Sequence, residues 1–302
     1  MSKNGWRRYV VLLCGSIAAA TPGLASGQET HADSDRPDLF VSSRNTNSVK
    51  RFDGATGEYL GDFVAPGSGG LSATQEVAFG PDGNLYVSGR GNPQILRFDG
   101  ESGEFLGPFT SGYDLDEPTK MTFGPDGKLY VSQWGKNKRT VARFNAVTGV
   151  YVDEVTPALQ EGMAHAWSED GTLYVASYGS KDVRRFGPGA ENLGVFTQGS
   201  ELASAVNLWF GEDGDLFVLD WERGRVARFD GSDGSYEGVF IDGLEKAEGV
   251  TLGHDGALYI CDWQKNQIHR YDAKTGEHLG IFASGGEMKQ PNGLVFGPSH
   301  SD

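Results

Sequence analysis

The chain has 302 residues, and its 41 Asp and Glu side chains outnumber its 26 Lys and Arg side chains, which leaves a formal net charge of −15 at pH 7. A surface of this sign repels the phosphate backbone of nucleic acids, so we expect no nucleic-acid partner. The length suffices for one large β domain or two small ones.

The chain begins with the features of a secretory signal peptide. Lys3, Arg7 and Arg8 form a basic start, an apolar run follows over residues 9–20, and Ala25–Gly27 offers small residues for cleavage. The apolar run is too short to span a membrane. We therefore predict a signal peptide over residues 1–27, no membrane span, and a protein exported to a periplasm or out of the cell.

Cleavage at this place changes the charge and the cysteine count of the mature chain. It removes three basic side chains and no acidic one, so the formal net charge falls from −15 to −18. It also removes Cys14, so Cys261 is left alone and no internal disulfide can form. The polar residues 28–37 predict a disordered lead-in to the folded part.

One phrase of ten residues occurs twice after the lead-in, as FGPDGNLYVS at Phe79–Ser88 and as FGPDGKLYVS at Phe123–Ser132. Looser copies follow, and each interval also repeats an RFD-like and an LGxF-like phrase. A period of roughly 20–50 residues is typical of solenoids and propellers. The copies are spaced 44, 44, 43, 42 and 44 residues apart, with first residues at Phe79, Phe123, Trp167, Phe210, Leu252 and Phe296.

Each repeat reads as four strands of an antiparallel sheet. Short segments such as NLYVS and ILRFD are rich in β-branched and aromatic residues and are bounded by Gly and Asp. The GPDG segments suit a type I turn, because Pro presets φ at the second position. No segment has a convincing helical period.

The two ends of the repeat array complete one another. The N-terminal part supplies three strands, at Leu39–Ser43, Lys50–Asp53 and Tyr59–Phe63, that lack a first strand, and Pro291–Gly297 is a first strand that lacks the rest. Joining them closes a ring and removes its free sheet edges. We predict an all-β, six-bladed β-propeller of four-stranded antiparallel blades over residues 38–298, with a tail at 299–302.

The repeated phrase GPDGxLYVSxxxxxxIxRFD resembles that of the NHL-repeat family and its streptogramin-lyase-like relatives, over essentially all of the mature chain. The resemblance implies that first strands line a central channel and that ligands bind at one mouth of this channel. It also implies a range of activities, because such propellers include lyases, lactonases and plain binding modules. Closed propellers of this kind are often monomers, so we expect a monomer.

Equivalent positions after the six second strands hold four aromatic residues and two arginines. Aromatic rings offer stacking surfaces, and arginine recognises carboxylates. One interpretation is a platform at the channel mouth for a small molecule, a glycan or a peptide, and the other is that the rings only pack between blades. The residues two places after the ends of the predicted second strands are Arg44, Arg90, Trp134, Tyr178, Trp221 and Trp263.

The residues that enter the first strands are unusually polar for strand packing. Glu76 and Asn207 are candidate ligand-binding residues there, since polar groups that converge on a channel can bind an ion, a substrate or water. AEGV at Ala247 and PNGL at Pro291 look like motifs that supply calcium ligands in gluconolactonase-type propellers, which implies Glu248 and Asn292 as ligands of Ca²⁺ or Mg²⁺. At the corresponding places the other blades carry Gln75, Thr119, Met163 and Val206. A cation held by Glu248 and Asn292 would therefore need water molecules to complete its coordination.

His165 is the only histidine on a first strand. Streptogramin lyases use a histidine at the channel mouth as a base, with Mg²⁺ polarising the ester, so the resemblance implies His165 as base and Lys120 as a helper with charge. The alternative is a structural histidine that is hydrogen-bonded among polar groups.

Two functions from different classes follow. The first is an exported ligand-binding or interaction module that acts through its channel-mouth face. The second is a metal-assisted lyase or hydrolase of esters or lactones with its site in the channel. The chain has no GxSxG, HExxH or P-loop motif, and whether it is an enzyme stays open at this point.

Overall fold

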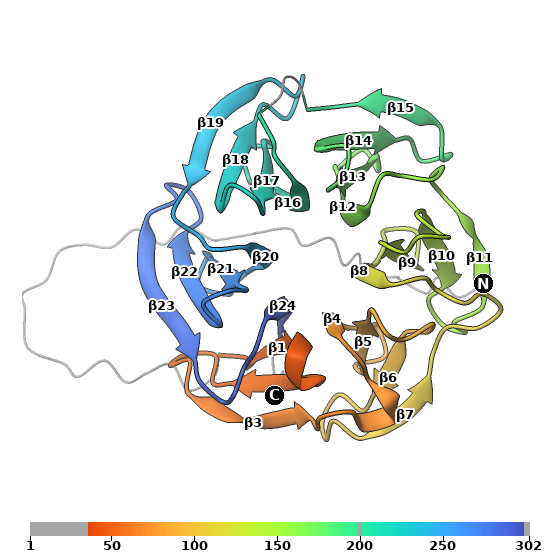
Figure 1. Ribbon diagram of the computed structural model, residues 1–302, viewed down its shortest axis with the longest axis vertical. Coiled ribbons are helices and arrows are strands. Elements are labelled where there is room, and N and C mark those ends of the chain that lie inside the picture. The colour runs from red at the N-terminus through yellow and green to blue at the C-terminus, as the bar shows by residue number, and fades with distance from the viewer. Residues whose placement is uncertain (1–35, 198–200, 299–302) are drawn as a thin grey trace, which may run out of the picture.

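A computed structural model describes residues 36–197 and 201–298. In these residues six sheets of four antiparallel strands stand around a central channel (Figure 1), so the six-bladed β-propeller predicted from the repeats is confirmed. The predicted signal peptide, most of the lead-in and the tail lie outside the described residues. Over these same residues, we find no helix with the length and apolar character needed to cross a membrane.

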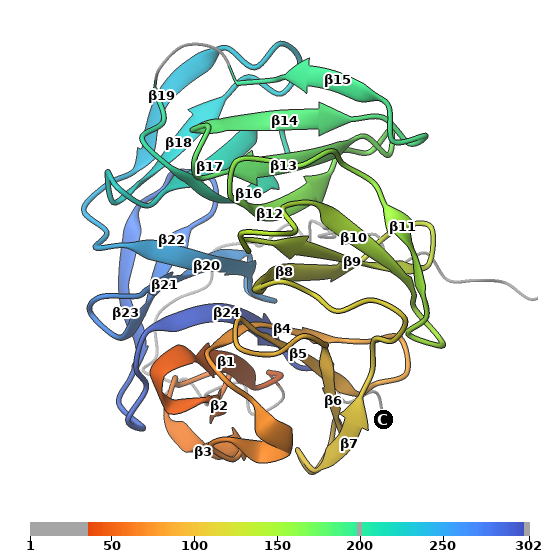
Figure 2. The same cartoon turned by 45° about the vertical axis from the view of Figure 1, so that its right-hand side comes forward.

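In each blade one strand lies innermost, at the channel, and the fourth strand from the channel lies at the rim of the disc (Figures 1 and 2). Two short 3₁₀ helices, η1 (Arg44–Thr46) and η2 (Ser68–Gly70), lie between strands. From the channel outward, the blades are β24 (Pro291–Phe296), β1 (Leu39–Ser43), β2 (Ser48–Phe52) and β3 (Tyr59–Val64); β4 (Thr74–Phe79), β5 (Leu85–Gly89), β6 (Leu96–Phe98) and β7 (Phe105–Pro108); β8 (Pro118–Phe123), β9 (Lys128–Gln133), β10 (Val141–Asn145) and β11 (Tyr151–Glu154); β12 (Gly162–Trp167), β13 (Leu173–Ser177), β14 (Asp182–Phe186) and β15 (Asn192–Val195); β16 (Ala205–Phe210), β17 (Leu216–Asp220), β18 (Arg225–Phe229) and β19 (Tyr236–Ile241); and β20 (Ala247–Leu252), β21 (Ala257–Asp262), β22 (Gln267–Asp272) and β23 (His278–Ser284).

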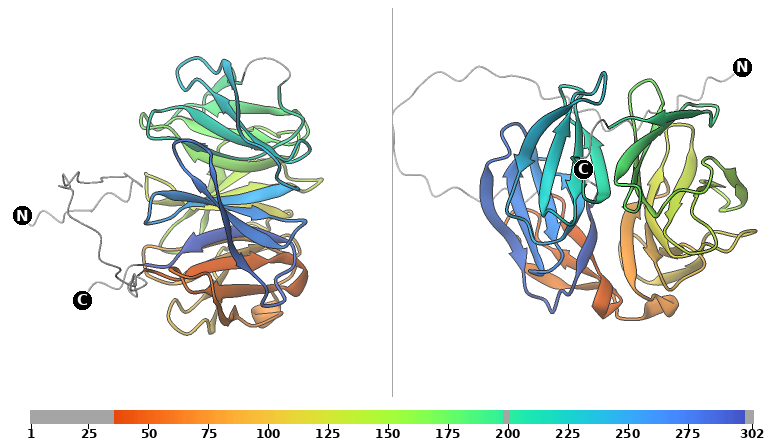
Figure 3. Two further views of the ribbon diagram at one scale, coloured as in Figure 1. Left: turned by 90° about the vertical axis from the view of Figure 1, so that its left-hand side faces the viewer. Right: turned by 45° about the horizontal axis from the view of Figure 1, so that its top comes forward.

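The blade that closes the ring combines both ends of the described chain. Strand β24 pairs antiparallel with β1, so that Leu39 lies opposite Phe296, and the backbone N–H of Gly297 donates to the carbonyl of Asp38 at 2.8 Å. Figure 3 shows the dark blue β24 beside the red strands of the first residues. We call this blade, made of β24, β1, β2 and β3, the seam blade.

The repeated phrase is explained by a contact on the face opposite the channel mouth. In the second blade, the hydroxyl of Tyr86 donates to the carboxylate of Asp82 at 3.0 Å, and the guanidinium of Arg97 lies 3.8 Å from that carboxylate. The turn Asp, the strand Tyr and the RFD-type Arg therefore hold three strands and a turn together, which is why the three letters recur as a set. Equivalent sets are Asp126, Tyr130 and Arg143, and Asp255, Tyr259 and Arg270.

The core lies between neighbouring blades. Second strands such as β5 are buried on both faces, because each blade packs against its two neighbours. Outer strands such as β3 alternate between exposed and half-buried residues. Cys261 is buried on β21 and free, so within the described residues the ring is held by packing and hydrogen bonds without a disulfide.

Candidate functional site at the channel mouth

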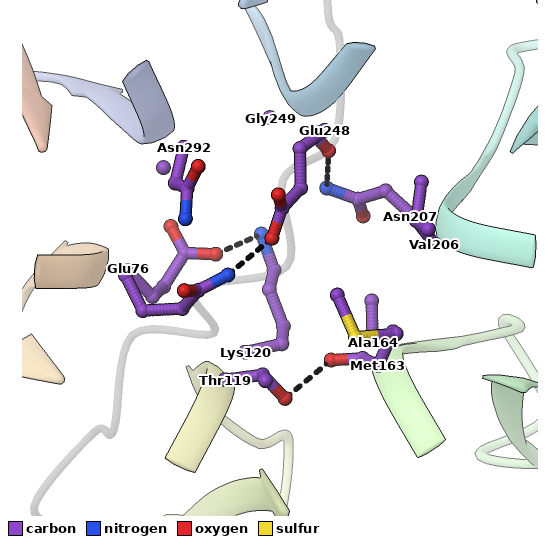
Figure 4. Close-up of a pocket in the computed structure, with 12 residues that line it drawn as sticks. Glu76, Thr119, Lys120, Met163, Ala164, Val206, Asn207, Glu248, Gly249 and Asn292 are labelled. Atoms are coloured by element: carbon purple, nitrogen blue, oxygen red, sulfur yellow. Dashed lines mark hydrogen bonds and ion pairs between the residues drawn. The ribbon is translucent and has the colours of Figure 1, made fainter. Parts of the chain in front are cut away.

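A β-bulge at the start of every innermost strand determines what faces the channel. In β4, for example, the register with β5 shifts between Thr74 and Val77. A bulge lets two residues of one strand oppose a single residue of its partner, so two neighbouring residues can face the same side. Twelve residues, two from each blade, line the resulting hollow: Gln75, Glu76, Thr119, Lys120, Met163, Ala164, Val206, Asn207, Glu248, Gly249, Asn292 and Gly293 (Figure 4).

Hydrogen bonds connect this lining from blade to blade. The side chain of Lys120 forms an ion pair with Glu76 at 2.9 Å, and the amide of Gln75 donates to the carboxyl of Glu248. The amide of Asn207 donates to the backbone carbonyl of Glu248 at 2.9 Å. Four of the residues predicted as site residues therefore meet at the hollow in two groups, the pair of Glu76 with Lys120 and the contact of Asn207 with Glu248 (Figure 4).

Asn292 is the exception in this network. Its side chain is 2% exposed and points into the hollow (Figure 4), yet neither its amide nitrogen nor its amide oxygen has a hydrogen-bond partner among the described residues. Buried polar groups without a partner are rare and unfavourable. A bound ligand or water that both donates and accepts hydrogen bonds would satisfy Asn292.

Glu248 is a second unusual group in the hollow. Burial raises the pKa of its carboxyl to about 7, against the opposing effects of Arg44, Arg90 and the hydrogen bond from Gln75. This carboxyl therefore exchanges its proton near neutral pH, and strongly perturbed carboxyls in clefts are typical of functional sites.

The residues around the hollow fit a divalent cation poorly. Ca²⁺ and Mg²⁺ require around six oxygen ligands, but Glu76 is paired with Lys120 and the carboxyl of Glu248 accepts from Gln75. The described residues contain no cluster of three His, Cys, Asp or Glu side chains arranged for a metal. With cationic side chains so close, the hollow suits an anionic or neutral polar group better, and we derive no step that involves a metal.

The six predicted mouth residues lie around the opening of the hollow. Each follows its second strand directly, one residue earlier than predicted, because strands such as β5 extend one residue further. The backbone N–H of each donates, over 3.0–3.3 Å, to the carbonyl of the residue that precedes a first strand. Five of those preceding residues have left-handed φ angles of 49–62° although none is glycine: Ala73, Glu117, Glu161, Lys246 and Gln290. Backbone strain of this kind is often found at binding sites.

Three of the mouth aromatics form an apolar half of the opening. Trp134 and Tyr178 contact edge to face with ring centres 5.1 Å apart, and Trp221 packs against the same core cluster, which extends into the channel through Met163 and Val206. All three rings are only half buried. The packing interpretation and the platform interpretation are therefore compatible, because the same rings contact the core and face solvent.

The rest of the mouth is cationic. Arg90 is held by Glu117, with Nε 2.9 Å from the carboxylate, and its guanidinium lies 5.0 Å from the centre of the Trp134 ring. Arg44, by contrast, has one side-chain hydrogen bond among the described residues, from Nη1 to the amide oxygen of Gln75 at 3.4 Å. Trp263 contacts Trp221 with ring centres 5.2 Å apart, and its buried indole N–H has no partner in the described residues.

His165 does not line the hollow. Its side chain is 2% exposed and lies between blades, where one ring nitrogen is 2.7 Å from the hydroxyl of Thr122 and the other is 2.7 Å from that of Ser132. Burial, and then the charge of Lys120, lowers its pKa to about 3. It occupies the position at which other blades place Leu208 or Leu294, which agrees with a structural histidine.

We expect His165→Leu to reduce the acid sensitivity of the fold. The folded pKa lies below the ordinary value of 6.5, so the stabilising contribution is complete above pH 6.5 and is lost as the pH falls towards 3. Between pH 7 and pH 5 the wild type should lose about 2 kcal/mol through this group, and the variant should not. Urea unfolding at both pH values measures the difference, and an equal acid loss in the two proteins would contradict this assignment.

Three residues of the mouth, Glu117, Glu222 and Lys246, were not found by sequence reasoning, whereas Gln75 was already noted among the residues that enter the first strands. Gln75 bridges Arg44 and Glu248, and Glu117 holds Arg90. Glu222 accepts from the Tyr178 hydroxyl at 2.8 Å and pairs with Lys246 at 2.8 Å. Sequence position could have identified these residues, because each lies beside the start of a first strand or the end of a second strand.

Comparisons with known proteins agree with the architecture. No family model and no curated protein matches the chain. Among solved structures, the chain is similar to one from a nidogen/laminin complex, with a TM-score of 0.72 and 16% identity over 87% of this chain and 99% of that one. It is also similar to a protein of unknown function from Bacteroides caccae, with a TM-score of 0.66 and 16% identity over 86% of this chain and 98% of that one.

These likenesses establish the fold and no more. Altogether 1309 chains of solved structures match, so the architecture is shared by far too many proteins to indicate one activity. The function of this chain has to be argued from its own channel mouth.

Proposed function

We propose that this protein is an exported binding module that holds a small molecule, glycan or peptide at the mouth of its propeller channel. The repeated phrase supports an NHL-type propeller with streptogramin-lyase-like relatives, and the basic and apolar start of the chain supports export. One of the solved structures with this architecture is from a complex of nidogen with laminin, which agrees with a binding role.

The observation that carries this proposal is the division of the mouth into two chemically different halves. Trp134, Tyr178 and Trp221 form the apolar half, and the next two blades in the ring carry Arg90, which lies against Trp134, and Arg44. Half-exposed aromatic rings on one part of an opening and arginines on the rest of it are the composition of a recognition surface. An aromatic side chain that only packed between blades would not need a polar group without a hydrogen-bond partner in the described residues, such as the indole N–H of Trp263.

The test is a pair of alanine substitutions at the mouth. Trp263→Ala and Trp134→Ala are expected to weaken binding of the ligand by about tenfold or more each, because buried aromatic anchors dominate recognition sites. Calorimetric titration of sugars, aromatic compounds and peptides measures this. Tyr59→Ala on the outer strand β3 is the matched control and should bind as the wild type does. Unchanged affinity in both Trp variants would refute a binding site at the mouth.

Acid–base chemistry on an ester or lactone at the same mouth is the second candidate. The specific observation in its favour is Glu248, whose carboxyl has a pKa of about 7 because of burial and could exchange a proton with a bound molecule. Turnover that Glu248→Gln abolishes while binding persists would establish this activity.

A further inference from the structure

We propose that the ligand of the channel mouth carries a carboxylate, and that the guanidinium of Arg44 and the side-chain amide of Asn292 bind it. This inference rests on the proposed function, because it assigns the chemical class of the ligand at the same site. It is carried by a cation that forms no ion pair within the described residues, an unsatisfied buried amide, and the arrangement of charges around them.

Arg44 is a cation without an ionic partner. Within the described residues it forms no ion pair, and its single side-chain hydrogen bond is the 3.4 Å contact with Gln75. Burial, and then the neighbouring guanidinium of Arg90, lowers the pKa of Arg44, against the opposing charges of Glu248 and Glu117, neither of which forms an ion pair with it. Since Arg90 already has Glu117, Arg44 keeps a free pair of N–H donors of the kind that grips a carboxylate in two places.

Asn292 supplies the complementary group at the bottom of the same site. The backbone N–H of Arg44 donates to the carbonyl of Gln290, two residues before Asn292, and Gln75 contacts Arg44 while it lines the hollow with Asn292. The amide nitrogen of Asn292 can donate to a carboxylate oxygen. Its amide oxygen then needs a donor, which a hydroxyl on the neighbouring carbon of the ligand would supply.

The surrounding charges favour an anion. Lys120 adds a positive charge that Glu76 balances at 2.9 Å. Burial raises the pKa of Glu248 to about 7, so near neutral pH this carboxyl is neutral for part of the time and repels an incoming carboxylate only weakly. Arg44 and Arg90 both face this group, and Glu117 neutralises one of them. The mouth is therefore a local cationic site in a protein of net charge −15.

The size of the hollow orients the ligand. The hollow has a cavity volume of about 20 Å³, which is enough for a water-sized polar group such as a carboxylate oxygen. The rest of the molecule must then lie outside the hollow, over Trp263 and Trp221. An acid with a ring or another flat apolar group, and a hydroxyl beside the carboxylate, would use every free group of the mouth.

Four related probes separate these contributions. Mandelate has a ring, a hydroxyl and a carboxylate; mandelamide lacks the charge, phenylacetate lacks the hydroxyl, and lactate lacks the ring. We expect mandelate to bind the mature protein about tenfold or more tightly than mandelamide, since hydrogen bonds to charged groups are the strong ones. Calorimetry at millimolar concentration and constant ionic strength measures the series.

Two variants and a control assign the carboxylate contact. Arg44→Gln should bind mandelate and mandelamide equally. Asn292→Ala should lose the preference for mandelate over phenylacetate, and it should fold normally, because the side chain of Asn292 makes no hydrogen bond within the described residues. Arg97→Gln removes an arginine beside Asp82 on the opposite face and should bind all four probes as the wild type does.

Nuclear magnetic resonance gives a readout that does not depend on tight binding. In ¹⁵N spectra, acetate should move the side-chain amide signals of Asn292 and the indole N–H signal of Trp263, whereas chloride at equal ionic strength should not. The absence of a shift with acetate and with mandelate would overturn the carboxylate site.

The outcomes also separate this inference from the proposed function. Equal binding of mandelate and mandelamide, with both weakened by Trp263→Ala, would overturn the carboxylate site and leave a binding module for neutral ligands. A preference for mandelate that survives Arg44→Gln would likewise overturn the assignment. If Arg44→Gln loses the preference for mandelate over mandelamide and Arg97→Gln keeps it, the assignment of the carboxylate contact to Arg44 is supported.

Discussion

Glu248→Gln is expected to stabilise the protein at pH 8 and to have little effect at pH 5. The folded pKa of about 7 lies above the ordinary value of 4.5, so the folded state holds this proton more tightly than the unfolded state. Its contribution to stability is therefore complete below pH 4.5 and is lost as the pH rises through 7. The difference of 2.5 pH units between these two values corresponds to about 3 kcal/mol, and Gln imitates the neutral carboxyl at every pH.

Thermal unfolding between pH 5 and pH 8 measures this effect. The midpoint of the wild type should fall with rising pH by several degrees more than that of Glu248→Gln. Glu101→Gln, which changes an exposed carboxylate in an outer turn, is the control and should follow the wild type. If Glu248→Gln shifts the midpoint by the same amount at both pH values, the buried carboxyl is not the titrating group.

A chain that stops at Gln290 is expected to lose the closed ring. Strand β24 forms the inner edge of the seam blade and packs on β20 and β4, and it brings Leu294, Val295 and Phe296 into the core clusters. Full burial of one such side chain stabilises a fold by about 1.5–3 kcal/mol, and Leu294 is buried while Val295 and Phe296 are half buried, so the loss of the three is a large part of the stability of a typical domain.

Circular dichroism and the thermal midpoint measure this loss. The matched control is a chain that ends at Pro298, which keeps all of β24 and should unfold at the wild-type temperature. Leu294→Ala, which removes one of the three side chains, should cost an intermediate amount of about 2–5 kcal/mol. A chain that ends at Gln290 and still melts cooperatively at the wild-type temperature would show that the ring does not depend on β24.

The fold could be predicted because its information is local and repeated. In three blades a turn Asp, a strand Tyr and an Arg contact one another within the same blade, as Asp82, Tyr86 and Arg97 do, whereas the copy that begins at Phe210 has Phe217 in place of the Tyr. The mouth residues were found for the same reason, since they follow the phrase at a constant distance.

The orientation of His165 could not be predicted, because it depends on the bulge in β12. The sequence shows Met163, Ala164 and His165 in succession, and a shift of one residue exchanges the faces of a strand. The bulge turns Met163 and Ala164 towards the channel and leaves His165 between blades.

The chemistry of the hollow was also hidden, because its partners come from different blades. Motifs around Glu248 and Asn292 resemble calcium ligands when each is read alone. The cationic groups that change this interpretation, Arg44, Arg90 and Lys120, belong to other repeats or to the opposite end of the chain. The left-handed residues before the first strands, such as Ala73, gave no signal because none is glycine.

The seam blade has a consequence for how the protein is made. The ribosome releases β1 first, and its partner β24 follows more than 240 residues later, so at typical synthesis rates of about 5–20 residues per second β1 waits on the order of ten seconds or more. During this time the inner edge of β1 has no partner strand, and unpaired edges of this kind invite association with other chains. Folding of the ring is therefore completed only after translation of the last strand.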